Sequence, residues 1–213
     1  MKDRRRGPAE LPNFGEPSTP RPAASVVLLR RGGKHSERGL EVLLLKRSES
    51  AQFMPSVWVF PGGTLDPEEG ASESGYRACA VRELAEEAGI ELDEDAELVP
   101  FSRWITPEVV SRRFDARFYL AMAPAHSSPR PDGVETTEAD WYEPKAALDA
   151  QAADRMAIAF PTLKQLEALL EFEAAEEAIE AHRGRPVEPI LPKIVGTREV
   201  HRILLPGDPD YPG

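Results

Sequence analysis

The chain has 213 residues, of which 41% are hydrophobic, and it carries a formal net charge of −11. This length and apolar content suit one domain with a sizeable core, whereas the acidic balance argues against a general nucleic-acid binder, because neutralising phosphates requires a basic face. No apolar run reaches membrane-spanning length, and the single cysteine excludes an intrachain disulfide, so we expect a cytoplasmic protein without nucleic-acid or membrane partners.

Prolines gather at the two ends of the chain and divide it into three parts. Of the 21 prolines, five precede Ser25 and six follow Arg185. The segment before Ser25 also lacks apolar periodicity. We therefore predict a flexible arm over residues 1–23, one folded domain over residues 24–185 and an irregular proline-rich segment over residues 186–213.

Apolar runs indicate an alternation of strands and helices. The first half predicts strands over residues 24–29, 41–45 and 57–60, a Pro-Gly-Gly loop at 61–63, and a helix over 76–88. The second half predicts strands over 98–106, 117–123 and 140–142, a helix beginning over 145–150, and one long helix over 162–182 that Pro161 would start. A last strand is expected over 200–205. Leu169, Phe172 and Ile179 of the long helix could form a dimer seam, so a homodimer is one arrangement that we consider.

The helix over 76–88 carries three glutamates at one face. Glu83, Glu86 and Glu87 are one to four positions apart, and residues three and four apart are neighbours on a helix. Like charges at this spacing repel by a few tenths of a kcal/mol per pair, and a divalent cation with oxygen ligands would offset the repulsion. A solvated acidic face is the alternative. The preceding Pro-Gly-Gly segment favours a ligand site, because adjacent glycines let the backbone approach a ligand closely.

Residues 82–90 resemble the signature of the Nudix hydrolases, Arg-Glu-hydrophobic-x-Glu-Glu-x-Gly-hydrophobic, at every specified position. The first half of that signature departs: five residues separate Gly63 from Glu69, as in the family, but twelve rather than seven separate Glu69 from Arg82. We infer an insertion before the helix, and either Glu68 or Glu73 could replace Glu69. The resemblance implies an α/β fold, a Nudix-type α/β/α sandwich with a mixed β-sheet.

A second motif resembles the coenzyme A-cleaving Nudix enzymes, a group that includes peroxisomal enzymes and bacterial relatives. Arg47 and Ser48 precede Phe60-Pro61-Gly62-Gly63 at the intervals of that motif, although Gln52 stands in place of its arginine and Ser56 in place of its glycine. The stretches 103–107 and 112–119 are also similar to this group. The resemblance implies metal-dependent cleavage of coenzyme A or acyl-CoA into 3′,5′-ADP and (acyl-)phosphopantetheine. The alternatives are an ADP-ribose or nucleotide-sugar diphosphatase and a non-catalytic nucleotide-binding module.

The family resemblance also implies roles for individual residues. Mg²⁺ or Mn²⁺ would be held by Glu83, Glu86 and Glu87 with the carbonyl of Gly63, while Arg82 would hold a carboxylate by bidentate pairing. A further acidic group, as base or ligand, is expected from a distant loop, with Glu135 the candidate base and Glu138 the candidate ligand; a plain surface loop explains both equally well. Candidates for binding substrate phosphates, because guanidinium matches phosphate, are Arg47, Arg103, Arg112 and Arg117. Surface ion pairs are the alternative for these arginines.

Overall fold

The computed structural model describes residues 17–32, 39–51, 53–196 and 201–212. Most of the expected N-terminal arm and Gln52 therefore lie outside the described residues. The strands are β1 (Arg21–Arg31), β2 (Leu40–Arg47), β3 (Trp58–Val59), β4 (Gly62–Thr64), β5 (Val99–Ile105), β6 (Phe114–Met122), β7 (Thr136–Tyr142), β8 (Pro189–Ile190), β9 (Lys193–Gly196) and β10 (His201–Leu204). The helices are α1 (Glu73–Ala88), α2 (Pro144–Ala152), α3 (Phe160–Leu169) and α4 (Ala175–His182).

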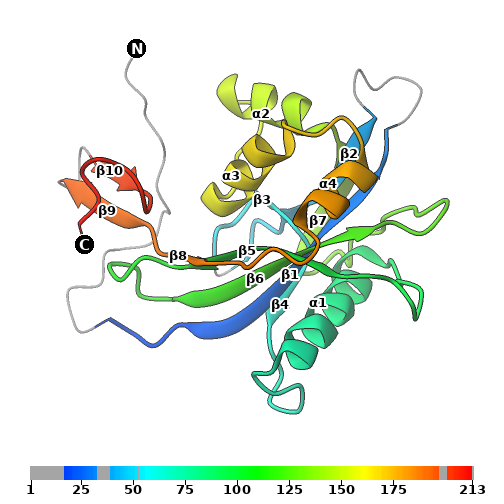
Figure 1. Cartoon of the computed structure of the whole chain (residues 1–213), viewed down its shortest axis with the longest axis horizontal. Coiled ribbons are helices and arrows are strands. Elements are labelled where there is room, and N and C mark those ends of the chain that lie inside the picture. The colour runs from blue at the N-terminus through cyan, green and yellow to red at the C-terminus, as the bar shows by residue number, and fades with distance from the viewer. Residues whose placement is uncertain (1–16, 33–38, 52, 197–200, 213) are drawn as a thin grey trace.

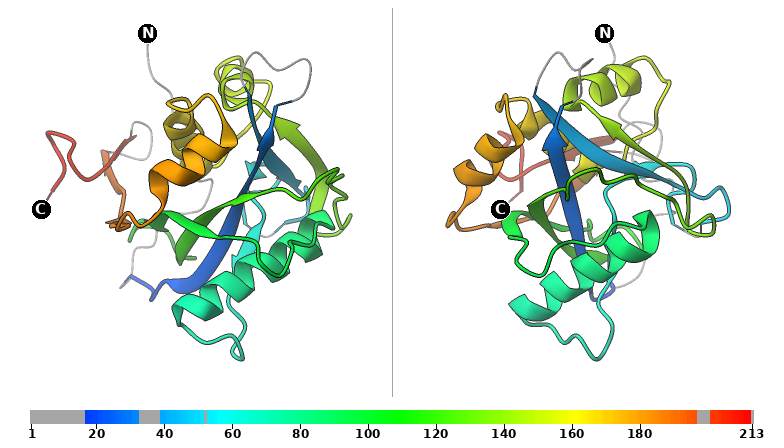
Figure 2. Two further views of the ribbon diagram at one scale, coloured as in Figure 1. Left: turned by 45° about the vertical axis from the view of Figure 1, so that its right-hand side comes forward. Right: turned by 90° about the vertical axis from the view of Figure 1, so that its right-hand side faces the viewer.

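A mixed sheet lies between helices on both of its faces. Within the described residues it has eight strands in the order β3-β2-β1-β6-β5-β8, with β4 beside β1 and β7 beside β2. The pairs β1–β6 and β5–β8 are parallel and the others are antiparallel. Helix α1 covers one face, and α2, α3 and α4 cover the other (Figures 1 and 2). The α/β/α sandwich that the resemblance implied is confirmed.

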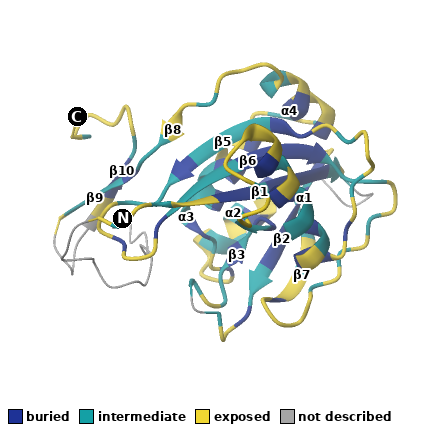
Figure 3. Ribbon diagram, turned by 90° about the horizontal axis from the view of Figure 1, so that it is seen from below, coloured by how far each residue is buried: buried dark blue, intermediate teal, exposed yellow. Residues whose placement is uncertain are grey.

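Both faces of the central strands are buried. On β1 and β2, Val27 and Leu44 belong to the apolar cluster beneath α2–α4, whereas Val26 and Leu43 belong to the cluster beneath α1. Figure 3 shows the same strands as mostly buried and the surrounding loops as exposed. Strands buried on both faces read as continuous apolar runs, which is why the sequence located them well.

The long helix predicted over 162–182 is wrong, because the chain forms two helices there. Helix α3 ends at Leu169, and Ala174 is extended (φ −136°, ψ 150°) where it bridges Gly39. This tertiary pairing interrupts a helix that contains no local breaker. Leu169 and Ile179 are buried in the chain's own core and are not available to a dimer seam, whereas Phe172 packs against that core and is partly buried. A homodimer stays a prediction.

The C-terminal segment contains more regular structure than the sequence predicted. Strand β8 extends the main sheet by pairing with β5, while β9 and β10 form a separate two-stranded sheet. The strand expected over 200–205 is β10, although Val200 lies outside the described residues. No helix in the described part of the chain is both long enough and apolar enough to cross a membrane. The division into three parts stays a prediction.

Candidate active site

Helix α1 carries Glu83 and Glu87 one turn apart on the face that looks toward β4. The helix begins after Ser72, whose hydroxyl accepts a hydrogen bond from the Gly75 N–H, and it ends at Gly89, which adopts φ 62° and ψ 27°. Serine is a favoured N-cap, and glycine is the usual residue in a left-handed C-terminal cap. These caps fix where the helix starts and stops, and the helix in turn fixes the positions of Glu83 and Glu87.

The Pro-Gly-Gly segment is not the loop that the sequence predicted, because Gly62–Thr64 forms strand β4 antiparallel to β1. A Cβ atom at Gly62 would overlap the hydroxyl of Ser25, and one at Gly63 would overlap the Glu83 carboxylate. Glycine is therefore required at position 62, where a Cβ would also overlap the Ala24 carbonyl oxygen, and at position 63 it lets the β4 backbone lie against the Glu83 carboxylate. As a result, the β4 backbone lies directly against the glutamates.

Glu87 is a buried carboxylate, only 3% exposed. It accepts a hydrogen bond of 2.9 Å from the Gly62 N–H. Burial raises the pKa of Glu87 to about 8; the Gly62 hydrogen bond and the charge of Arg47 lower the pKa, whereas the charges of Glu83 and Glu135 raise it further. A carboxylate that is desolvated beside other carboxylates favours a cation as its neighbour.

Arg82 holds several carboxylates at once. Its Nη1 lies 2.9 Å from Glu83 Oε1 and 2.9 Å from Glu86 Oε2, and its Nε lies 3.0 Å from Glu69 Oε1. Its Nη2 also donates to the Thr64 carbonyl at 3.2 Å, which ties α1 to β4. The guanidinium of Arg82 is thus occupied by acidic partners from its own chain.

The lengthened loop before α1 brings Glu69 to Arg82 despite its twelve-residue separation. The Glu69 side chain is 13% exposed, and it accepts a 2.7 Å hydrogen bond from the Asp66 N–H. Glu68 is exposed, and Glu73 pairs instead with two other arginines. Of the three acidic residues that the sequence left open, Glu69 is therefore the one joined to the glutamate face.

The three glutamates expected as a metal cluster do not converge. The Glu86 side chain is 60% exposed and pairs with Arg82, and no group of three or more His, Cys, Asp or Glu side chains in the described residues is arranged to hold a metal ion. The Gly63 carbonyl faces the Cys79 thiol, 3.6 Å away. Glu83 and Glu87 remain as a pair. Their chemistry fits Mg²⁺, which commonly takes one or two protein carboxylates and completes its shell with water and substrate phosphates.

A pocket of about 410 Å³ opens beside β4. Two rows of residues in register across the sheet form its floor. These rows are Thr64, Ala23, Ala116 and Trp104, and beside them Gly62, Ser25 and Phe118. The middle strands β1 and β6 contribute mostly small side chains, which leaves the space above the sheet open.

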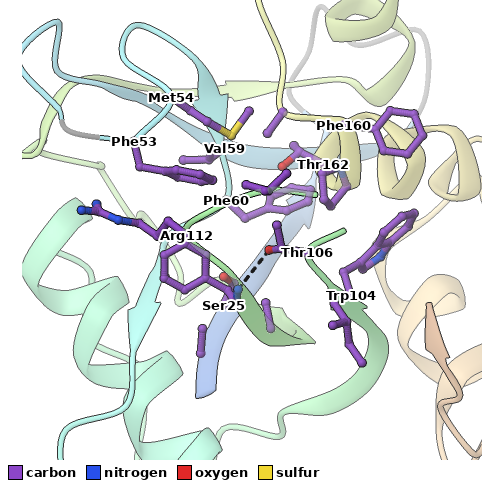
Figure 4. A pocket seen from close by; sticks show the side chains of 18 of the residues that line it. Ser25, Phe53, Met54, Val59, Phe60, Trp104, Thr106, Arg112, Phe160 and Thr162 are labelled. Atoms are coloured by element: carbon purple, nitrogen blue, oxygen red, sulfur yellow. Dashed lines mark hydrogen bonds between the residues drawn. The ribbon is translucent and has the colours of Figure 1, made fainter. Parts of the chain in front are cut away.

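The β4 end of this pocket is polar. Arg47 and Glu135 line it together with the β4 glycines, and the Arg47 Nε donates to the Phe53 carbonyl at 3.0 Å. Arg112 also lines the pocket, and it lies on the opposite side from Trp104 (Figure 4). Two of the four predicted phosphate-binding arginines and the predicted base therefore line one pocket with Gly62 and Gly63, the glycines that Glu87 and Glu83 contact.

The structure does not bring the remaining predicted residues to this pocket. Glu138 lies on β7, where it pairs with a lysine of β2 at 2.7 Å. Arg103 makes a bidentate pair with Asp115 at 2.8 and 2.7 Å, and Arg117 pairs with Glu73 at 2.7 Å. Both arginines line a second, smaller cavity of about 260 Å³. Their placement gives no support to the roles predicted for them.

Several pocket residues have no signal in the sequence. Phe53 and Met54 come from the loop between β2 and β3, and Ile194 and Ile203 come from the β9–β10 hairpin. Scattered apolar residues in loops and short strands form no motif, so only the fold reveals that they meet. Ser56 in the same loop adopts φ 60°, a left-handed conformation that explains why glycine stands there in the motif that this stretch resembles.

Comparisons with known proteins agree with this geometry. Residues 19–163 match the model of the NUDIX domain family. The chain is 27% identical over 230 residues to putative nudix hydrolase 7 of Caenorhabditis elegans, covering 90% of this chain and 74% of that protein. It is 25% identical over 271 residues to acyl-coenzyme A diphosphatase NUDT19 of Xenopus laevis, covering 81% and 71%.

Among solved structures, a NUDIX hydrolase from Alicyclobacillus acidocaldarius has a TM-score of 0.70 at 23% identity, covering 79% of this chain and 99% of that one. This likeness shows a shared fold. The family match ends at residue 163, near the start of α3, so the β9–β10 hairpin lies beyond it.

Proposed function

Because the chain belongs to the Nudix family, whose hydrolases cleave pyrophosphate bonds in small nucleotide substrates, we propose that it is a metal-dependent diphosphatase with coenzyme A or acyl-CoA as its substrate. The observation that carries the proposal is the placement of Glu83 and Glu87 against the β4 glycines at one end of a pocket. The similarity to an acyl-coenzyme A diphosphatase over 81% of the chain supports the choice of substrate.

We propose that Glu83 and Glu87 hold Mg²⁺ or Mn²⁺. A divalent cation bound there would neutralise the diphosphate and lower the pKa of an attacking water. The Gly62 N–H orients Glu87, and Arg82 orients Glu83 through a 2.9 Å ion pair. Outer partners of this kind fix the direction of a ligand oxygen.

The pocket arginines are our candidates for binding the diphosphate. Arg47 and Arg112 line the pocket, and a planar guanidinium binds phosphate oxygens in a bidentate way. Glu135 lines it too, and its charge is the last of the causes that raise the pKa of Glu83 and of Glu87, after desolvation by burial. We assign Glu135 the role of the base that accepts a proton from the attacking water.

The test is product analysis by mass spectrometry after incubation with Mg²⁺ or Mn²⁺ and, separately, coenzyme A, octanoyl-CoA, ADP-ribose and a nucleotide sugar. We expect 3′,5′-ADP with phosphopantetheine from coenzyme A and with the acylated form from octanoyl-CoA. Brisk turnover of ADP-ribose without cleavage of either coenzyme A species would overturn the substrate assignment. Binding of these compounds without turnover of any would favour the nucleotide-binding module and overturn the diphosphatase.

A further inference from the structure

The pocket extends well beyond the β4 glycines that Glu83 and Glu87 contact. Its floor crosses the four strands β4, β1, β6 and β5 in register, from Thr64 to Trp104. Neighbouring strands lie about 4.8 Å apart, so three spacings place the two ends of this row about 14 Å from each other. The part of a substrate that lies over β5 is therefore far from a diphosphate held at β4.

Aliphatic side chains wall the β5 end. Ile194 and Ile203 are partners across the β9–β10 hairpin and therefore point to the same side. Both line the pocket, and Ile203 is only 8% exposed. The charged residues of the pocket lining, among those that the structure describes, are Arg21, Arg47, Arg112 and Glu135, and none of them lies on β5 or on the β9–β10 hairpin. A phosphate or an unpaired sugar would lose its hydration there without compensation.

Trp104 adds aromatic surface to this end. It is 5% exposed, and it packs edge-to-face on Phe160 with ring centroids 6.1 Å apart. Both residues line the pocket, so their rings extend the apolar wall that the isoleucines form.

From these observations we infer that the β5 end binds the acyl group of the substrate, with the hydrocarbon chain lying against Ile194 and Ile203. This inference rests on the proposed function and narrows it from coenzyme A to acyl-CoA. The β9–β10 hairpin, which lies outside the family match, then determines specificity.

A nucleobase is the competing occupant, and the geometry favours it elsewhere. A base stacks on flat aromatic faces and needs both donors and acceptors. Phe53 lies on the side of the pocket opposite Trp104, near Arg112 (Figure 4), and it forms an aromatic pair with Phe114 at 5.4 Å. The aromatic pair therefore suits the nucleotide, and the aliphatic end suits the acyl chain.

The test is equilibrium binding by calorimetry in EDTA, so that no turnover occurs, with coenzyme A and with butyryl-, octanoyl- and dodecanoyl-CoA. For the wild-type protein we expect affinity to rise with chain length, by up to about fourfold for each methylene buried, until the end is filled. Ile194→Ser should flatten this dependence. The matched control is Val195→Ser, because Val195 lies on the other face of β9 opposite Arg202, and it should keep the wild-type profile. A flat wild-type profile, or equal effects of the two variants, would overturn the inference.

A third variant keeps the inference testable if Ile194→Ser does not fold. Ile194→Trp should narrow the β5 end and shift the best-bound acyl chain to a shorter length; an unshifted optimum contradicts the inference. Because binding is measured without metal, the acyl-binding role of the β5 end and the proposed diphosphatase function can be refuted independently of each other. Chain-length-dependent binding without cleavage would overturn the proposed function alone, and cleavage without chain-length dependence would overturn the acyl site alone.

Discussion

The two ends of the pocket are built from the sequence in different ways. At the β4 end, one short stretch from Gly62 to Glu87 places glycines against carboxylates, and Arg47 and Glu135 join it from elsewhere in the chain. The β5 end gathers Trp104, Ile194 and Ile203 from separate elements. The proposed metal ligands therefore come from one local motif, whereas the proposed acyl site depends entirely on how distant segments pack.

The largest effect is expected at the β4 end from Glu87→Gln. Removing this charge should lower kcat by more than about 100-fold, since even outer partners of a metal site are worth 10- to 100-fold. The measurement is steady-state kinetics with Mn²⁺, with circular dichroism to confirm the fold. Glu86→Gln is the matched control, because Glu86 is exposed and pairs only with Arg82 among the contacts described above. Equal losses of kcat in both variants would contradict the proposal that Glu83 and Glu87, rather than Glu86, hold the metal ion.

Arg82→Lys should have the next largest effect. Lysine cannot reproduce the fork that joins Glu69, Glu83 and Glu86, so we expect kcat to fall about 10- to 100-fold. The loss should be the same for coenzyme A and octanoyl-CoA, because Arg82 acts at the β4 end. A loss confined to the acylated substrate would break the distinction between the two ends.

A larger side chain in the floor of the pocket should obstruct a substrate that extends from the β4 end to the β5 end. Ala116→Leu adds three carbons between β4 and β5, where the floor is formed by small side chains. We expect the KM for octanoyl-CoA to rise by about tenfold or more, consistent with overpacking costs of about 1–3 kcal/mol, with a smaller change in kcat. Thermal melting checks the fold, and an equal KM for wild type and variant would show that the substrate does not cross the floor.

The smallest effect concerns the loop between β2 and β3. Ser56→Gly should raise the free energy of unfolding by up to about 1 kcal/mol, because a left-handed conformation costs a side-chain-bearing residue about 1–2 kcal/mol and glycine's flexibility in the unfolded chain offsets part of the gain. Denaturant titration measures it. Ser111→Gly, at an exposed position without positive φ, should instead be neutral or destabilising. Stabilisation by both substitutions would refute the role of backbone strain.

The sequence predicted the elements whose signals are local. The central strands are continuous apolar runs, and α1 ends before Gly89 as its sequence indicates, although it begins at Glu73 rather than at the predicted residue 76. The break between α3 and α4 escaped prediction because Ala174 becomes extended by pairing with Gly39, which is distant in the chain. Gly62–Thr64 was misassigned because glycines are typical of turns, although here they pair with β1.

The candidate site shows the same division. The pairing of Arg82 with carboxylates follows from its place in the motif, and Glu69 from its spacing after Gly63. The ion pair of Arg103 with Asp115, by contrast, depends on the β5–β6 register. An arginine that forms an ion pair with an acidic residue on the neighbouring strand cannot be distinguished from a phosphate-binding arginine until the pairing register of the strands is known.

The most direct test of the two-ended site is the ratio of kcat/KM for octanoyl-CoA to kcat/KM for ADP-ribose, measured with Mn²⁺ on the wild-type protein. Both compounds present a diphosphate to the β4 end, but only octanoyl-CoA can fill the β5 end. We predict a ratio of at least about ten in favour of octanoyl-CoA, within the discrimination that a hydrophobic pocket provides. A ratio of one or less would contradict the account.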